Sequence, residues 1–457
     1  MTGPNLRNKD YLEFDIRVIQ PDEGFPEVQM NSPVGEQSGR IRIALPYWEN
    51  VQEALASASR MSQPWVKQSV ALDTLDPISE MGETLFTGLF EGGREILYRR
   101  ALEVAESEGM GLRLRLQITD PELATLPWEF MYDRRAAMFI GLSTRSSLIR
   151  TLPTAYPTLP PSDLSTLKML VINTTLNGDV YVKEEIERLR NLQDHFPQLE
   201  IEVIGSVTDK YDFLESITRY KSHILHIIGT GMVIGQNRQA LPIGWQGDLP
   251  NTQIEDLDPK HLVPGNQLAD ILRENPRFRL VTFSAAYTEQ LAAEIAVNIP
   301  AVVGIRSAMT SRSYITFMEG MYQALLKGQL LDTAITAGRQ EIDLKNPGSR
   351  EWGLPVFYMQ AAEGILLVEA PESAKTTEPI GLTPQAPISR SQPPQDPKIL
   401  RTWQKLTATL EVYERNLLAL EEDKTRYGEK TPKFIDDEIE KTNVMIADIK
   451  DQMDAIG

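Results

Sequence analysis

Apolar residues follow two patterns in the first 367 residues of the chain. In two segments polar and apolar residues alternate, which is typical of strands with one buried face. In five shorter segments most residues are apolar, as in strands that are buried on both faces. The expected strands lie at 11–19, 111–118, 168–173, 201–204, 224–228, 280–284 and 301–305.

Segments with helical periodicity lie between these strands and after the last of them, at 183–192, 290–296 and 313–326. Strands that alternate with helices predict a mostly parallel, wound sheet with helices on its faces. We therefore expect an α/β fold over residues 11–367.

Beyond residue 367 the pattern changes twice. Residues 368–398 are rich in proline and lack aromatic residues, which predicts a semi-flexible linker. Residues 399–457 carry two mostly apolar seams with a 4-3 spacing, which predicts an antiparallel coiled-coil hairpin of two helices. The seam residues that we expect at a partner or oligomer interface are Trp403, Leu406, Leu410, Tyr413, Leu417, Ile439, Ile446, Ile449 and Met453.

Composition excludes several classes of site. The chain has 46 basic and 64 acidic residues, a formal net charge of −18, and its densest basic stretches are pairs of arginines, so we expect no nucleic-acid ligand. It has no cysteine and four histidines, which leaves no thiol, no disulfide and no expected metal site. No Walker-type loop is present, so we expect no nucleotide hydrolysis and no cofactor. Surface positions in solvent are expected for Arg99, Arg100, Arg134, Arg135, Arg312 and Arg339.

The N-terminal residues lack the apolar core of a signal peptide, and no apolar run approaches the roughly 20 residues of a membrane span. We therefore expect a cytoplasmic protein without membrane contact.

Two strand ends carry the most informative motifs. Residues 222–231 and 280–288 resemble the two catalytic strand ends of the CHAT branch of caspase-like peptidases. In that family the first strand ends in His-aromatic-x-Gly-His-Gly and the second in Asn-Ala-Cys-x-Thr or a close variant. Further segments that look like CHAT landmarks, in the expected order, are 32–36, 122–133 with its Pro-Trp-Glu block, and 351–359.

The resemblance implies a two-lobed CHAT domain with a caspase-like sheet. We expect an N-terminal lobe over 1–165, which resembles a pseudo-caspase subdomain, and a caspase-like C-terminal lobe over 166–367. Trp128 and Trp352, which lie within the landmarks, are expected to be packing residues.

The resemblance also implies that the catalytic dyad is lost. Thr230 stands where the family has its base, and Ala286 stands where it has its nucleophile. An alanine cannot attack a carbonyl, and a threonine hydroxyl has no pKa near neutrality. A peptide could still bind uncut in the remaining groove, whose expected residues are Gly229, Thr230, Gly231, Ser284, Ala285 and Ala286; the alternative is that 229–231 is only a turn after a core strand.

Two catalytic alternatives stay open from the sequence. Ser284 or Thr288 could form a hydrolase with His226, although a hydrogen-bonded core histidine fits the apolar strand around residue 226 better. The native gene could also encode a cysteine at position 286 that was replaced by alanine for study, which would make the protein a CHAT cysteine peptidase.

We expect a catalytically inactive adaptor, scaffold or regulator in a bacterial defence or signalling system, a setting that the resemblance implies. Its partner would be a protein, such as an active protease or an NTPase of the same system, or a further copy of the chain. A structural subunit that forms filaments is a third reading.

Overall fold

The structure is a computed structural model that describes residues 11–21, 24–41, 43, 77–153, 166–175, 180–234, 239–244 and 258–360, with single positions at 443, 446, 447 and 450. The chain divides into two units, residues 1–374 and 375–457. The predicted linker at 368–398 lies outside the described residues, as does the hairpin except at those four positions. These four are helical, and Ile446 is buried.

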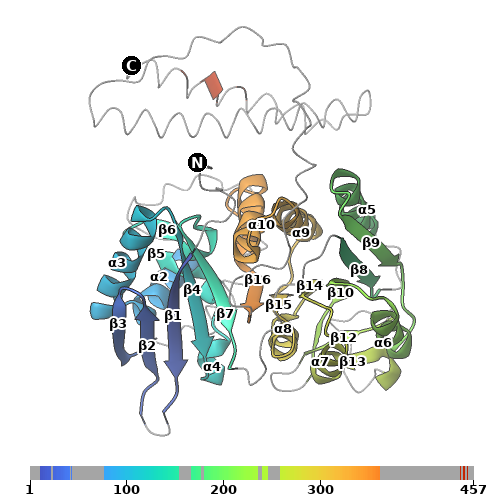
Figure 1. The fold of residues 1–457 in the computed structure, drawn as a ribbon, viewed down its shortest axis with the longest axis horizontal. Coiled ribbons are helices and arrows are strands. Elements are labelled where there is room, and N and C mark those ends of the chain that lie inside the picture. The colour runs from blue at the N-terminus through green and yellow to red at the C-terminus, as the bar shows by residue number, and fades with distance from the viewer. Residues whose placement is uncertain are drawn as a thin grey trace, which may run out of the picture. The chain divides into compact units, whose positions relative to one another are not determined.

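The described part of the first unit is built on one sheet of eleven strands (Figure 1). In spatial order these are β3 (Gly35–Arg40), β2 (Glu27–Ser32), β1 (Tyr11–Ile19), β4 (Gly111–Ile118), β7 (Ser146–Thr151), β16 (Pro355–Met359), β15 (Ala301–Ile305), β14 (Leu280–Ala286), β10 (Ile224–Thr230), β8 (Leu167–Asn173) and β9 (Leu199–Ile204). Two smaller sheets contain β11 (Met232–Val233), β12 (Gln239–Pro242) and β13 (Leu262–Pro264), and β5 (Tyr132–Asp133) with β6 (Met138–Phe139).

Most neighbouring strands in the large sheet are parallel. The antiparallel pairs are β1 with β2, β2 with β3, and β15 with β16. From β8 the chain moves outward to β9, and then crosses to the other side of β8 for β10, β14 and β15. The strand order therefore reverses between β8 and β10. In wound sheets, ligands bind outside the carboxyl ends of the strands at such a reversal.

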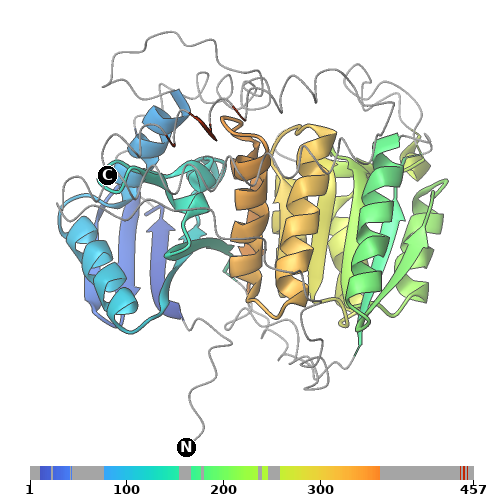
Figure 2. The same cartoon turned by 90° about the horizontal axis from the view of Figure 1, so that it is seen from above.

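Helices cover both faces of the sheet. They are α2 (Pro77–Leu89), α3 (Gly93–Ser107), α4 (Pro121–Ala124), α5 (Val180–His195), α6 (Lys210–Arg219), α7 (Gly265–Glu274), α8 (Glu289–Ala296), α9 (Ser311–Leu326) and α10 (Leu331–Lys345), with short 3-10 turns η3 (Trp128–Phe130), η4 (Ile140–Leu142), η7 (Pro259–His261) and η8 (Glu351–Gly353). In Figure 2, α10, α9 and α5 lie side by side over one face, coloured orange, gold and green. The cores show that α6, α7 and α8 pack on the opposite face.

The two predicted lobes share this sheet. Strand β7 of the N-terminal half (residues 1–165) pairs in parallel with β16 of the C-terminal half (166–367), with Arg150 opposite Tyr358. One apolar core combines Phe130, Phe139 and Ile149 of the first half with residues of α9 and α10. The halves are therefore joined through the backbone as well as through side chains.

The predicted mixed α/β fold with a large, mostly parallel sheet is confirmed, and each of the seven predicted strands is present. The prediction of a turn at 229–231 is wrong at its start, since β10 continues through Thr230. Within the described ranges, no helix combines the length and apolar character that crossing a bilayer requires.

Candidate functional site

The two positions that the sequence singles out lie opposite each other. Strands β10 and β14 are parallel neighbours, and Thr230 and Ala286 are register partners at their carboxyl ends. The amide of Gly231 donates a hydrogen bond to the carbonyl oxygen of Ala286 at 2.7 Å, which ties the two strand ends together. The pair lies one strand from the reversal between β8 and β10, so the fold places it at the edge where ligands bind.

Gly231 is required by a close backbone approach. A Cβ atom at this position would lie 2.3 Å from the carbonyl oxygen of Tyr287 and 2.7 Å from that of Ala286. The sequence predicts that a peptide could bind at residues 229–231. At Gly231 the neighbouring backbone belongs to the protein itself, because the carbonyl oxygens of Ala286 and Tyr287 fill the space beside the glycine.

The expected groove residues differ in their exposure. Ser284 and Ala285 are 5% and 0% exposed, and side chains alternate between the two sheet faces, so Ala285 belongs to the core under α7 and α8. These two residues do not line a surface that a peptide reaches in this conformation. Gly229 and Thr230 are half-buried, and Ala286 keeps 7% of its surface exposed.

A buried polar cluster lies beneath this pair on the face of α5 and α9. The Nε2 atom of His226 is 3.1 Å from one carboxylate oxygen of Glu185, and the hydroxyl of Ser284 donates to the other at 2.9 Å. The Nδ1 atom of His226 is 2.9 Å from the hydroxyl of Thr282 and 3.1 Å from that of Tyr322. Burial raises the pKa of the Tyr322 hydroxyl above its usual range, so it stays protonated.

This cluster confirms the expectation of a hydrogen-bonded core histidine, because His226 has no exposed surface and both ring nitrogens have partners. It does not form a Ser/His nucleophile pair. The Ser284 hydroxyl bonds to a carboxylate instead of the imidazole, and the Thr288 hydroxyl donates to the carbonyl of Ala285 at 2.8 Å. The arrangement that a serine or threonine hydrolase needs is absent among these side chains.

The helix that follows β14 offers no open anion site. The side-chain oxygen of Gln239 accepts the amides of Gln290 and Leu291 in the first turn of α8, at 2.9 and 3.3 Å. Free amides at a helix start can hold an oxyanion or a phosphate. Here a side chain of the protein occupies these two donors.

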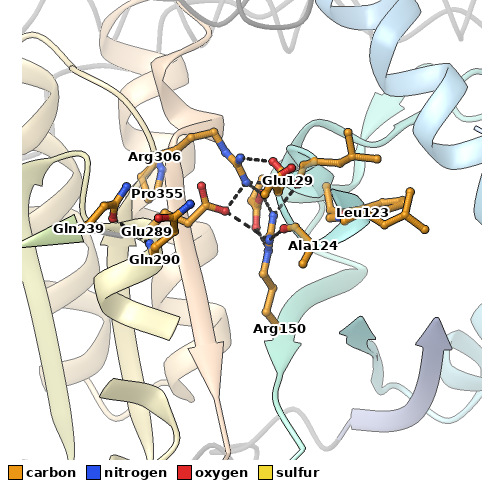
Figure 3. A network of polar contacts seen from close by, with 12 residues as sticks. Leu123, Ala124, Glu129, Arg150, Gln239, Glu289, Gln290, Arg306 and Pro355 are labelled. Atoms are coloured by element: carbon orange, nitrogen blue, oxygen red, sulfur yellow. Dashed lines mark hydrogen bonds and ion pairs between the residues drawn. The ribbon is translucent and has the colours of Figure 1, made fainter. Parts of the chain in front are cut away.

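A second polar cluster lies where the two halves of the first unit meet, and we call it the junction cluster (Figure 3). It consists of Glu129 and Arg150 from the N-terminal half and Glu289 and Arg306 from the C-terminal half. Arg150 makes a bidentate contact with Glu129, with both nitrogen–oxygen distances at 2.8 Å. Arg306 is 2.6 Å from Glu289 and 3.5 Å from Glu129.

The guanidinium groups of the junction cluster also satisfy backbone carbonyls. Arg150 donates to Ala124 and Leu126 at 2.8 and 2.9 Å, and Arg306 donates to Thr125 at 2.6 Å. These carbonyls come just before the Pro-Trp-Glu block, whose glutamate is Glu129. The Pro-Trp-Glu block therefore contributes to the ionic contacts that join the two halves.

The two carboxyl groups of the junction cluster differ electrostatically. Burial acts to raise the pKa of Glu129, but Arg150 and Arg306 outweigh it and hold that pKa below its usual range. Burial also raises the pKa of Glu289, and there it outweighs the same two arginines, so the pKa lies above its usual range. The negative charge of the cluster is therefore held most firmly on Glu129.

A second ionic contact joins the halves through α10. Asp332 accepts hydrogen bonds from Arg113 of β4 at 2.9 Å and from the Ser147 hydroxyl of β7 at 2.8 Å. Arg113 also donates to Glu13 of β1 at 2.7 Å. All of these except Glu13 are buried.

The prediction that the arginines lie in solvent is wrong for Arg339. This residue of α10 is 1% exposed, and burial lowers its pKa to about 10, so it remains charged. It donates to the carbonyl oxygen of Pro355 at 2.8 Å. Arg99 also departs from the prediction, since it is half-buried and bonds to both carboxylate oxygens of Asp133.

Trp128 and Trp352 are packing residues, as the sequence predicts. Both are fully buried, and the Trp352 ring lies 5.1 Å from the Phe130 ring and 4.9 Å from the Phe139 ring, centroid to centroid. Among the residues that the structure describes, no group of three or more His, Asp or Glu side chains is arranged to hold a metal ion. Apart from Ile446, the seam residues expected at a partner interface lie outside the described residues.

Comparison with known proteins gives the following result. No family model matches the sequence, and a search of curated proteins finds no match. Two solved structures of the separase–securin complex of Saccharomyces cerevisiae contain similar chains, with sequence identities of 11% and 10% and a TM-score of 0.41 for each. The matches cover 78% and 76% of this chain and 30% of each neighbour, so this chain spans less than a third of the proteins it matches.

Proposed function

We propose that this protein is a non-catalytic member of the caspase-like peptidases, of the CHAT type, that binds an extended peptide segment of a protein partner without cutting it. The observation that carries the proposal is the register pair of Thr230 and Ala286. The two side chains meet at the strand ends where the family has its catalytic pair. Alanine has no group that can attack, and a threonine hydroxyl cannot act as a base near neutrality.

The surroundings of the pair support the same proposal. The one described histidine on these two strands is His226, which is sealed in the core and engaged by Glu185, Thr282 and Tyr322. The first amides of α8, which could hold an oxyanion, are taken by Gln239. The sheet and its edge, together with the engaged His226 and Gln239, support a binding role in place of acyl transfer.

The wider role is that of an adaptor, scaffold or regulator. The resemblance of the strand-end motifs to CHAT proteins supports a bacterial defence or signalling setting, with an active protease or an NTPase of the same system as the partner. A binding role needs only the shape of the edge and its exposed groups.

A phage-displayed library of random 12-residue peptides, selected on the full chain, tests this proposal. We expect enriched peptides that bind with micromolar affinity and that mass spectrometry finds intact after prolonged incubation. Thr230→Arg should weaken binding at least tenfold, because it fills the half-buried strand end. Thr218→Arg, at an exposed position of α6, is the matched control and should bind as the unmodified protein does.

Three results would overturn the proposal. Cleavage of a selected peptide by the unmodified chain would show a working nucleophile. Equal binding by Thr230→Arg would place recognition elsewhere on the molecule, and failure to enrich any peptide would remove peptide binding as the function.

A further inference from the structure

Tyr287, which follows Ala286 directly, has an unusual backbone conformation. Its φ is 55°, in the left-handed region that favours glycine. Among the residues that the structure describes, Ala137 is the one other non-glycine residue with a positive φ. A bulky residue in this conformation persists only where its neighbours enforce it, and such positions gather at binding and active sites.

The residues on both sides of Tyr287 hold it in place. Before it, the carbonyl of Ala286 accepts the Gly231 amide at 2.7 Å. After it, two hydrogen bonds join Thr288 to Ile305 of β15. The Thr288 amide donates to the Ile305 carbonyl at 2.9 Å, and the Ile305 amide donates to the Thr288 hydroxyl at 2.9 Å. The direction in which the Tyr287 side chain leaves the backbone is thus set by two neighbouring strands.

The Tyr287 side chain is 41% exposed, and no hydrogen bond of its hydroxyl is found among the described residues. Core packing does not account for the exposed part of this side chain. A rigid, exposed aromatic side chain loses little conformational entropy when it binds, which is why such side chains often dominate binding energies.

Other exposed apolar side chains lie at the same edge of the sheet as Tyr287. Within the described part of the C-terminal half, the large exposed hydrophobic residues all belong to segments that follow the carboxyl ends of β8, β9, β10 and β14. They are Val180, Tyr181, Tyr211, Val233 and Tyr287. The N-terminal half has two in its described residues, Phe25 and Ile96. The exposed apolar surface of the C-terminal half is therefore gathered at the edge that contains Thr230 and Ala286.

Charges of both signs lie among these residues. Lys183 and Glu184 follow Tyr181 in α5, and Asp209, Lys210 and Asp212 surround Tyr211 in α6. An edge without an excess of positive charge gives no net attraction to a phosphate backbone or to an anionic membrane surface. It matches an uncharged, hydrophobic stretch of a partner protein.

We infer that Tyr287 is the specificity-determining residue of this edge, where its ring packs against an apolar or aromatic side chain of an extended partner peptide. This inference rests on the proposed function of peptide binding. It adds the chemical class of the peptide and the residue that selects it.

The 12-residue peptides selected on the unmodified chain, labelled with fluorescein, are the probes for this inference. We expect their shared feature to be one large hydrophobic residue, whose replacement by aspartate weakens binding at least tenfold. Tyr287→Ala and Tyr287→Gly should each weaken binding at least tenfold, and Tyr287→Phe should stay within about threefold because the ring carries the contact. Phe25→Ala, an exposed aromatic position in the other half, is the control and should leave binding unchanged.

Thermal unfolding separates recognition from a structural role. Glycine relieves the left-handed conformation, so the midpoint of Tyr287→Gly should equal that of the unmodified chain or exceed it by about 1–2 °C. A midpoint several degrees lower would overturn the inference, because Tyr287 would then stabilise the fold.

The binding data keep the two proposals apart. If Tyr287→Ala binds the peptides as tightly as the unmodified chain while Thr230→Arg does not, the inference fails and the proposed function stands. If the unmodified chain enriches no peptide, the proposed function fails and the inference fails with it.

Discussion

The junction cluster and the strand ends at Thr230 and Ala286 are opposites in their chemistry. In the junction cluster Glu129 and Arg150 are buried and Glu289 and Arg306 are half-buried, and contacts among these four charged groups run as short as 2.6 Å. The strand ends present a methyl group, a threonine hydroxyl and backbone. The chain therefore keeps charge where its halves are joined and has none at the register pair that would do chemistry.

The two motifs differ in what the fold requires of them. Glu129 of the Pro-Trp-Glu block binds Arg150, which is buried, and Arg306, which is half-buried, and its loss would leave both with Glu289 as their remaining acidic partner. Nothing in the core depends on a base at position 230 or on a nucleophile at position 286. The stability of the fold is therefore expected to depend more on the junction cluster than on the side chains at positions 230 and 286.

Glu129→Ala should give the largest effect on stability. It leaves Arg150 and Arg306 buried with Glu289 as their one acidic partner, so we expect the free energy of unfolding to fall by about 3–5 kcal/mol. Urea denaturation followed by circular dichroism measures this change.

Glu83→Ala is the control for that variant. Glu83 pairs with Arg134 at 3.1 Å on the surface, and such pairs contribute up to about 1 kcal/mol. If the two variants lose the same stability, the junction cluster does not hold the halves together.

Periodicity predicted the sheet well, because strands buried on both faces have apolar sequences that stand out. It missed β2 and β16, although their residues fit the two patterns, and it missed β3 and β7, whose residues break them. Strand β3 reads Gly-Glu-Gln-Ser-Gly-Arg and lies at the sheet edge almost fully exposed, so no buried face constrains its sequence. Strand β7 reads Ser-Ser-Leu-Ile-Arg-Thr and is buried, but it buries its polar groups against Asp332 and Glu129.

The candidate site was predictable in part. The two strand-end motifs identified Thr230 and Ala286, and the parallel pairing of β10 with β14 brings them together. Glu185 was not predicted as a partner of His226 and Ser284, because 41 residues separate it from His226 and its helix looks like a charged surface helix. Tyr287 was missed because a positive φ on a tyrosine has no signature in the sequence.

Asp332→Ala should give a smaller effect at the other ionic contact between the halves. It removes the bonds from Arg113 and Ser147, but Arg113 keeps Glu13 at 2.7 Å, so we expect a loss of about 2–3 kcal/mol. The measurement is again urea denaturation, with Asp270→Ala as control. Asp270 pairs with Arg273 at 2.8 Å in solvent, and its loss should cost less than about 1 kcal/mol. Equal losses would show that Arg113 does not need Asp332.

The smallest expected effect is the change of stability with pH in two variants, Glu129→Gln and Glu289→Gln. It distinguishes the two carboxyl groups of the junction cluster. The pKa of Glu129 is lowered in the folded state, so its ionisation contributes stability above the unfolded pKa of about 4.3, and this is lost as the pH falls through the folded pKa. The pKa of Glu289 is raised, so its contribution has the opposite sign: it is complete below the unfolded pKa and is lost as the pH rises through the folded pKa.

Glu129→Gln should therefore cost more stability near pH 7 than near pH 4, whereas Glu289→Gln should cost less near pH 7 than near pH 4. Urea denaturation of both variants and the unmodified chain at the two pH values measures these differences. The same pH trend in both variants would show that the two carboxyl groups share the positive charge of the arginines equally. Opposite trends would place the charge that fastens the halves on Glu129, the glutamate of the motif that this chain has kept.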